Sequence, residues 1–260
     1  MASKVALVTA SSAGLGAAVV KQLAAKSFNI VINYHSRESK ALEVAQACES
    51  ISSSPASTPR YHIVKADVTT RAGIQHLVSE TIKQFGRLDV VVSNTGYTRM
   101  TNFMKFEEGC LEEDWDRCFT TNVKAHLWLF EAAKPYLEKA YEESGGQNRG
   151  SFVTIASTAG IKPSGSSLPY GVSKAAQIHL SKCLAVICGP SIRINTVSPG
   201  LMLTEWGSKF PAERIEAMKE KATLKMVSEV DDVAGTVVEL STNGSITGQN
   251  FVVDGGFSLG

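Results

Sequence analysis

The sequence lacks a paired-cysteine motif, a long apolar run and a surplus of charge of either sign. Its five cysteines are odd in number and scattered, so neither a disulfide framework nor a zinc site is expected. No run approaches the roughly 20 apolar residues that a membrane span needs. Lys and Arg number 26 against 25 Asp and Glu, which gives no electrostatic reason to expect a nucleic acid or an acidic membrane as partner.

The two ends of the chain carry no recognisable targeting signal. The first apolar stretch, residues 5–8, is too short for a signal peptide and is interpreted as a strand. The closing Ser-Leu-Gly matches no retention or peroxisomal address. We therefore expect a cytoplasmic protein, and no metal-binding cluster is visible.

Short runs rich in Val and Ile alternate with longer stretches of helical spacing. Because the runs lack polar alternation, they predict strands buried on both faces of a parallel sheet. The expected strands are residues 5–8, 30–32, 61–64, 88–92, 152–155, 192–197 and 251–253. The helical stretches include residues 15–26, 39–48, 74–85 and 125–141. This alternation predicts an α/β fold: a doubly wound Rossmann fold with about seven parallel strands and helices on both faces.

No boundary divides the 260 residues, so a single domain over 1–260 is expected. Residues 50–60, rich in Ser and Pro, and residues 144–150, rich in Gly, are interpreted as surface turns. A third zone, residues 201–227, is irregular and follows the sixth expected strand.

A glycine-containing loop follows the first strand and reads Thr9-Ala10-Ser11-Ser12-Ala13-Gly14-Leu15-Gly16. Glycine lets the backbone turn tightly and approach a pyrophosphate, while the N-terminus of the next helix offers free N–H groups. Strand, loop and helix in this order favour a dinucleotide site over an ordinary turn. Ala10 stands where a first glycine is expected, so the turn should carry some strain.

The end of the second strand favours NADP(H) over NAD(H). A NAD site usually places a carboxylate about 20 residues beyond the first loop glycines. Here the segment is Asn33-Tyr34-His35-Ser36-Arg37, in which Arg37 could pair with a 2′-phosphate and Ser36 could donate a hydrogen bond. The alternative is that Arg37 is one more exposed loop arginine.

Tyr170 and Lys174 form the candidate catalytic pair. Residues i and i+4 share one face of a helix, so the ammonium can approach the phenol and favour its ionised form. The phenol could then exchange the proton that balances a hydride transfer. Ser157 lies at the end of the strand over residues 152–155, where its hydroxyl could hold the substrate oxygen.

With these motifs in place, the chain resembles the short-chain dehydrogenase/reductase family over essentially its whole length. The resemblance implies that Asn122 helps hold a water linking Lys174 to solvent, and that Lys174 also binds the nicotinamide ribose. It implies that Asp67 and Val68 contact adenine, and that residues 201–227 form a variable substrate loop. Ser93-Asn94-Thr95-Gly96 departs from the family's Asn-Asn-Ala-Gly, with little expected loss. The full set expected to bind the cofactor is Thr9, Ser11, Ser12, Gly14, Leu15, Gly16, Tyr34, Ser36, Arg37, Asp67, Val68, Asn94, Gly96, Tyr170, Lys174, Pro199, Gly200 and Thr204.

The expected function is an NADP(H)-dependent oxidoreductase acting on a carbonyl or secondary alcohol carbon. A lyase, epimerase or cyclase on the same scaffold and a non-catalytic NADP(H) sensor are the alternatives. Candidate pocket residues suggest a partly apolar, medium-sized ketone or alcohol, although ordinary loop packing explains them almost as well: Tyr97, Met100, Ile161, Leu201, Met202 and Trp206.

The resemblance also implies a homodimer or homotetramer built through a four-helix contact. The helices concerned are those around residues 125–141 and 170–188. Trp128, Phe130 and Leu137 could serve that contact or face their own core.

Overall fold

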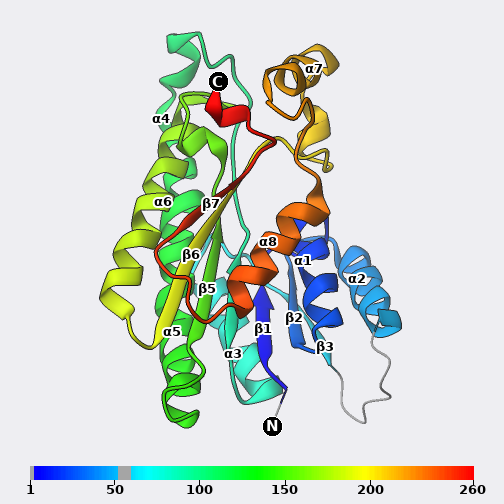
Figure 1. The fold of residues 1–260 in the computed structure, drawn as a ribbon, viewed down its shortest axis with the longest axis vertical. Helices are drawn as coiled ribbons and strands as arrows, with labels where there is room; N and C mark the ends of the chain where they lie inside the picture. Colours follow the sequence, from blue (N-terminus) through cyan, green and yellow to red (C-terminus); the bar gives the residue numbers. More distant parts are fainter. Residues whose placement is uncertain (1–2, 52–59) are drawn as a thin grey trace.

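A parallel sheet runs through the computed structural model, which describes residues 3–51 and 60–260 (Figure 1). Within that part of the chain seven strands pair in the order β3-β2-β1-β4-β5-β6-β7, all parallel. Their bounds are β1 Val5–Val8, β2 Asn29–Tyr34, β3 Tyr61–Lys65, β4 Val90–Ser93, β5 Gly150–Ile155, β6 Ile192–Pro199 and β7 Asn250–Val253. The predicted α/β fold class is confirmed: the chain forms a single Rossmann-like domain.

Helices cover both faces of the sheet. One apolar core lies between the sheet and α1 (Gly14–Ala25), α2 (Glu38–Ile51) and α8 (Val230–Thr242). A second core lies on the other face, under α3 (Arg71–Phe85), α5 (Ala125–Glu143) and α6 (Leu168–Cys188). The short helix α4 (Glu112–Phe119) packs against α6, and α7 (Ala212–Lys221) stands at the end of the sheet where the strands finish (Figure 1).

The expectation that all seven strands are buried on both faces is wrong for the two edges. The inner strands β1, β4, β5 and β6 are buried throughout. At the edge, Phe251 and Val252 of β7 keep 36% and 41% of their surface exposed. β3 is only partly buried. An edge strand has one neighbouring strand instead of two, so apolar composition alone does not reveal its exposure.

Two irregular segments contain more helix than the sequence suggested. Ser50 and Ile51, expected in a surface turn, are the last residues of α2, while residues 52–59 lie outside the described part. The irregular zone 201–227 holds the regular helix α7. None of its ten residues is buried, and without a buried apolar stripe its periodicity carries little signal. None of the described helices is long and apolar enough to cross a membrane.

The sheet order places a crevice beside the end of β1. The chain moves outward from β1 to β2 and β3, then returns to add β4 on the opposite side of β1. Helices on either side of such a switch point diverge and leave an opening at the carboxyl ends of the strands. The glycine loop follows β1, and Asn94 follows β4, so both predicted cofactor segments meet at this point.

Candidate active site

The loop after β1 is held in a strained shape by hydrogen bonds. Ala10 has a φ of +48°, in the left-handed region that alanine rarely adopts, as the missing glycine led us to expect. Its amide donates to Asn33 Oδ1 at 2.9 Å. A Cβ on Gly16 would lie 2.6 Å from the Ala10 carbonyl oxygen and 2.8 Å from Asn94 Nδ2, so only glycine fits there.

Polar side chains of the loop connect it to β2 and β4. The Ser11 hydroxyl donates to the Val8 carbonyl oxygen at 2.7 Å and accepts from the Asn33 amide at 3.0 Å. Asn94 donates from its amide to Thr9 Oγ1 and from its side chain to the carbonyl oxygen of Thr9. Ser11 and Thr9 are fully buried, and their hydroxyls therefore support the loop from within the protein.

The residues predicted to lie on the adenine side of the cofactor follow β2 and β3. Tyr34 ends β2, and Ser36 and Arg37, both exposed, follow after His35. Arg37 forms an ion pair with Glu205, a residue of the irregular zone 201–227 that no feature of the sequence singled out. That contact holds the pKa of the Glu205 carboxyl below its ordinary value.

Asp67 and Val68 follow β3, and Asp67 is built to remain ionised. Its Oδ1 accepts hydrogen bonds from the Thr69 amide at 2.9 Å and from the Thr69 hydroxyl at 2.7 Å. Burial alone would raise the pKa of Asp67, but these two hydrogen bonds and the nearby His35 together outweigh it, and the pKa is lowered.

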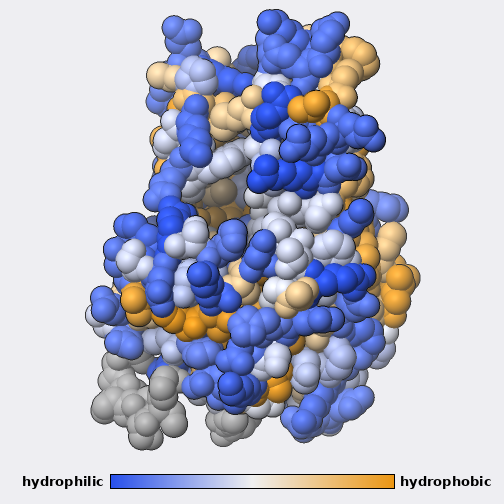
Figure 2. Space-filling model, turned by 180° about the vertical axis from the view of Figure 1, so that it is seen from behind, coloured by the Kyte–Doolittle hydropathy of each residue, from blue (hydrophilic) through white to orange (hydrophobic). Residues whose placement is uncertain are grey.

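A cavity of about 530 Å³ opens at the carboxyl ends of the strands, and Figure 2 shows the surface hollowed between two lobes of mainly hydrophilic side chains. Half of the predicted site residues line it: Gly14, Leu15, Asn94, Gly96, Ser157, Tyr170, Lys174, Pro199, Gly200 and Thr204. Thr204 reaches back over the glycine loop, since a Cβ on Gly14 would lie 3.4 Å from Thr204 Cγ2. The remaining ten lie outside this cavity: Thr9, Ser11, Ser12, Gly16, Tyr34, Ser36, Arg37, Asp67, Val68 and Asn122.

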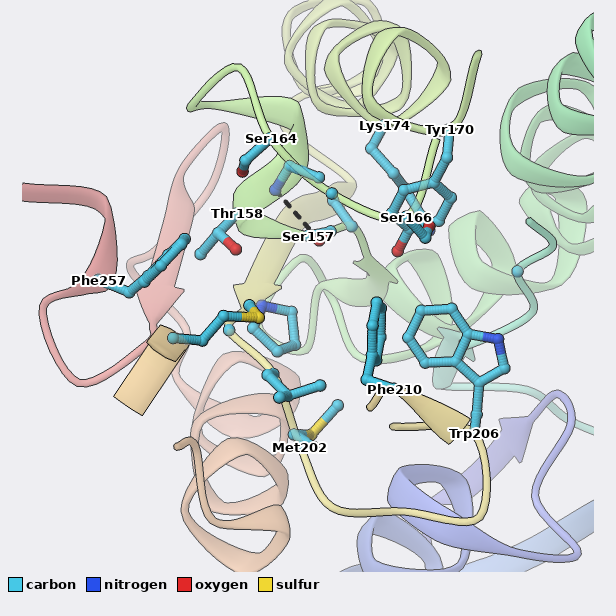
Figure 3. A pocket seen from close by; sticks show the side chains of 18 of the residues that line it. Ser157, Thr158, Ser164, Ser166, Tyr170, Lys174, Met202, Trp206, Phe210 and Phe257 are labelled. Carbon is cyan, nitrogen blue, oxygen red and sulfur yellow. Dashed lines mark hydrogen bonds between the residues drawn. The ribbon is translucent and has the colours of Figure 1, made fainter. Parts of the chain in front are cut away.

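Tyr170 lies in the first turn of α6, which Ser167 caps by accepting a hydrogen bond from the Tyr170 amide. Burial raises the pKa of Tyr170 to about 12, although a hydrogen bond with Ser157 lowers it in part. Ser157 is fixed in turn, because its Oγ accepts from the Ala159 amide at 3.2 Å (Figure 3). The phenol is therefore protonated near neutral pH, and it is not shifted towards the phenolate as the sequence suggested.

Lys174 does not offset this effect of burial. Its side chain is almost completely buried, and desolvation lowers the pKa of its ammonium to about 7. Its Nζ donates to the Ile155 carbonyl oxygen at 2.8 Å and to Gln177 Oε1 at 2.9 Å, and it lies 5.8 Å from the centre of the Tyr170 ring. An ammonium that itself tends to lose its proton stabilises a phenolate weakly.

Asn122 lies in a π-helical turn, Thr120–Lys124, between α4 and α5. Such turns are rare and frequently found at functional sites. The Asn122 amide side chain joins two walls of the site: Oδ1 accepts from the Tyr97 amide at 2.8 Å, and Nδ2 donates to the Tyr97 carbonyl oxygen and to Ser173 Oγ.

Two polar residues of this region were missed from the sequence. Gln177 is fully buried, accepts from Lys174 Nζ and donates to the Ile155 carbonyl oxygen at 3.1 Å. Its spacing of three from Lys174 on one helix face was the available signal. His126 is buried with Nδ1 2.6 Å from Ser93 Oγ, and burial lowers its pKa to about 3. The Ser93 hydroxyl therefore contacts the buried ring of His126, which lies 33 positions later in the chain and which the residues around Ser93 did not indicate as its partner.

The wall opposite Tyr170 is apolar and aromatic. Trp206 and Phe210 face it, with the Trp206 ring centre 6.3 Å from that of Tyr170 (Figure 3). Of the expected pocket residues, Tyr97, Leu201, Met202 and Trp206 line the cavity, whereas Met100 and Ile161 do not. Sequence reasoning missed three phenylalanines and two methionines of the lining, which come from loops and helices far apart in the chain: Phe103, Met104, Phe210, Met218 and Phe257.

A nicotinamide dinucleotide fits the residues present. A loop that binds a pyrophosphate needs glycine where its backbone passes close to neighbouring atoms, and Gly16 is such a position. The helix α1 begins at Gly14 with its N-terminus towards the loop. The same cavity runs from Gly14 to Ser157 and Tyr170. A cofactor bound along it would bring a reactive ring to the hydroxyls of Ser157 and Tyr170.

The chain is similar to known oxidoreductases over nearly its whole length. Residues 9–258 match a family model described as enoyl-(acyl carrier protein) reductase. A Streptomyces violaceoruber protein named as a ketoacyl reductase of the granaticin polyketide synthase is 34% identical, covering 98% of this chain and 96% of that protein. Human dehydrogenase/reductase SDR family member 4 is also 34% identical, covering 98% and 88%. A solved short-chain dehydrogenase/reductase from Serratia marcescens superposes with a TM-score of 0.84 at 29% identity, covering 98% of each chain.

Proposed function

Because the chain belongs to the short-chain dehydrogenase/reductase family, we propose that it is an NADP(H)-dependent reductase of ketones, with Tyr170 as its acid and base. The proposal rests on one observation: the glycine loop, Ser157, Tyr170, Lys174 and a set of apolar side chains all line the same cavity. The relatives support hydride transfer as the reaction class, and a relative named as a ketoacyl reductase supports a carbonyl substrate.

The residues of the site have distinct tasks in the proposed reduction. The bound cofactor supplies the hydride to the carbonyl carbon. Ser157 donates a hydrogen bond to the carbonyl oxygen, and Tyr170 gives that oxygen the proton that completes the alcohol. A phenol with a pKa near 12 is protonated before the reaction, which suits reduction. Lys174, whose buried ammonium readily gives up its proton, would then restore the Tyr170 phenol.

The NADP(H) preference rests on the end of β2. Arg37 is the cation nearest in sequence to the expected 2′-phosphate position, and no carboxylate stands at residues 33–37 to hold ribose hydroxyls. Arg37 is paired with Glu205, and this carboxylate would repel a 2′-phosphate that binds the same guanidinium. The proposed preference therefore includes a competition between Glu205 and the cofactor.

A homodimer or homotetramer is part of the same proposal. Val186 and Ile187, in the last turn of α6, keep 85% and 73% of their surface exposed, and Leu127, in the first turn of α5, keeps 38%. Phe130 and Leu137, considered for the predicted four-helix contact, instead face their own core. The cytoplasmic location also remains a proposal.

The test is a cofactor-consumption assay with a panel of ketones and aldehydes, run with NADPH and with NADH. Tyr170→Phe keeps the ring and removes the proton, so kcat should fall by about 10²–10⁴-fold while cofactor affinity changes little. A Tyr170→Phe protein with more than about half the activity would remove Tyr170 from the mechanism. A protein that binds NADPH but reduces no carbonyl compound would point to the sensor, lyase, epimerase or cyclase alternatives.

A further inference from the structure

One wall of the cavity is formed by a helix that is not part of the core. Arg214, Ala217, Met218 and Lys221 of α7 line the cavity, at spacings of three, four and seven residues that share one helix face. This face therefore looks into the cavity, with an apolar centre and a cation at each end.

The charge of the cavity lining has one sign. Among the lining residues that the structure describes, the charged ones are Lys174, Arg214 and Lys221, and none is Asp or Glu. The acidic residues Glu216 and Glu220 of α7 instead pair with Lys219 and Lys225 outside the lining. The catalytic Lys174 accounts for one of the three cations, which leaves Arg214 and Lys221 without a task in the proposed hydride transfer.

Arg214 is fixed close to the reacting centre. Its Nη2 donates to the Gly165 carbonyl oxygen at 2.8 Å, and its guanidinium carbon lies 4.9 Å from the centre of the Phe210 ring. Gly165 abuts the catalytic tyrosine, since a Cβ on it would lie 3.6 Å from Tyr170 Cδ1. A guanidinium carries five N–H donors, so a second face of Arg214 can still bind a ligand.

We infer that the substrate is an oxo acid: a ketone with an apolar or aromatic body and a carboxylate that Arg214 binds, assisted by Lys221. The planar guanidinium matches a carboxylate with two parallel hydrogen bonds. The apolar body lies against Trp206 and Phe210, opposite Tyr170 (Figure 3). This inference rests on the proposed function and names the substrate class of the same site.

The reaction remains balanced with this substrate. The cofactor's hydride forms the new C–H bond at the ketone carbon, the C=O π pair moves to oxygen, and the Tyr170 proton completes the hydroxyl. The carboxylate keeps its charge throughout and serves only for binding. Its loss from the substrate should therefore raise KM and leave kcat nearly unchanged.

The test compares acids with their neutral esters in the full-length protein. The substrates are 4-oxo-4-phenylbutanoate and 5-oxo-5-phenylpentanoate, each beside its methyl ester; methylene groups separate the ketone from the carboxyl group, so the ester keeps a ketone of similar reactivity without the charge. We expect at least one acid to be reduced with a kcat/KM roughly 10- to 150-fold above that of its ester, the range for a charge-assisted hydrogen bond. Arg214→Gln should remove this advantage through KM, and Arg214→Lys should restore part of it. Lys219→Gln, which changes a cation of α7 outside the lining, is the control and should leave the ratio unchanged.

Each outcome separates the inference from the proposed function. Equal reduction of acids and esters, with no effect of Arg214→Gln on their ratio, overturns the oxo-acid inference and leaves the reductase proposal standing. Acetoacetyl-CoA, whose phosphates lie far from its thioester, is compared with the neutral N-acetylcysteamine thioester. Dependence on Arg214 for the CoA compound alone would also overturn the inference, in favour of a carrier phosphate. Failure to consume NADPH or NADH with any of these ketones would instead contradict the reductase proposal.

Discussion

Arg37, three residues beyond β2, forms an ion pair with Glu205, which lies 168 positions later in the zone that follows β6. Both side chains are at least half exposed, so the pair contributes little to stability. Its importance lies in cofactor binding, because the residue proposed to hold the 2′-phosphate already has a negatively charged partner.

Removing Arg37 should weaken the binding of NADPH but not that of NADH. Arg37→Ala should weaken NADPH binding by roughly 10- to 150-fold, since a hydrogen bond to a charged group contributes about 1.5–3 kcal/mol. NADH, which has no 2′-phosphate, should bind nearly as before. Fluorescence titrations of both cofactors measure this. Equal weakening of both, or of neither, would make Arg37 an ordinary loop arginine.

Removing its partner should act in the opposite direction. Glu205→Gln frees Arg37 and takes away a carboxylate that would repel the phosphate, so NADPH should bind several-fold more tightly while NADH is unaffected. In the Arg37→Ala background most of this gain should disappear, because the competition no longer exists. Glu216→Gln, an exposed acid of α7 paired with Lys219, is the matched control. A gain of similar size for NADH would contradict the proposed competition.

Gln177 should act on the reaction through Lys174. Its Oε1 accepts from the buried ammonium, and Gln177→Leu removes this acceptor at similar size, so the pKa of Lys174 should fall further below about 7. The limb of the kcat–pH profile that depends on charged Lys174 should move about one pH unit lower. Gln177→Glu places a carboxylate at the same point and should move the limb higher. If both variants lose stability but keep the original profile, Gln177 serves packing alone.

Replacing the strained Ala10 of the glycine loop should stabilise the protein. A left-handed alanine costs about 1–2 kcal/mol, and glycine returns about 0.5–1 kcal/mol of that as extra chain entropy, so Ala10→Gly should raise the free energy of unfolding by about 0.5–1 kcal/mol. Gly14→Ala, at a φ of +54° in the same loop, should change stability in the opposite direction. Urea denaturation measures both. A loss of stability in Ala10→Gly would show that the loop relaxes the strain by other means.

His126 should make the fold sensitive to acid. Burial lowers its pKa to about 3, whereas the unfolded chain titrates near 6.5, so between these values the unfolded state binds an extra proton. Stability should therefore fall as pH falls through this window, by about 1.4 kcal/mol per pH unit from this residue alone. His126→Gln should show a correspondingly shallower loss in urea denaturation between pH 6.5 and 4.5. The exposed His179, changed to Gln, should leave the slope as it is. Equal slopes for the original protein and His126→Gln would contradict this assignment.

Local patterns predicted the parts of the molecule that depend on neighbours in sequence. The alternation of strands and helices, the glycine loop with Ala10 in place of a glycine, and the placement of Tyr170 and Lys174 on one helix all follow from spacings of a few residues. Other features depend on how segments distant in sequence pack against one another. They are the exposure of the edge strand β7, the Arg37–Glu205 ion pair and the Ser93–His126 contact. The raised pKa of Tyr170 was missed for a similar reason, since its burial comes from several elements at once.

The helix α7 has none of its residues buried, yet it forms one wall of the cavity. Changes to its sequence therefore remove little apolar surface from the two cores that hold the sheet together. The protein can vary its substrate range and its folding free energy almost independently. An α7 segment taken from a relative should alter which substrates are accepted, while the sheet and the residues beneath α7 stay intact.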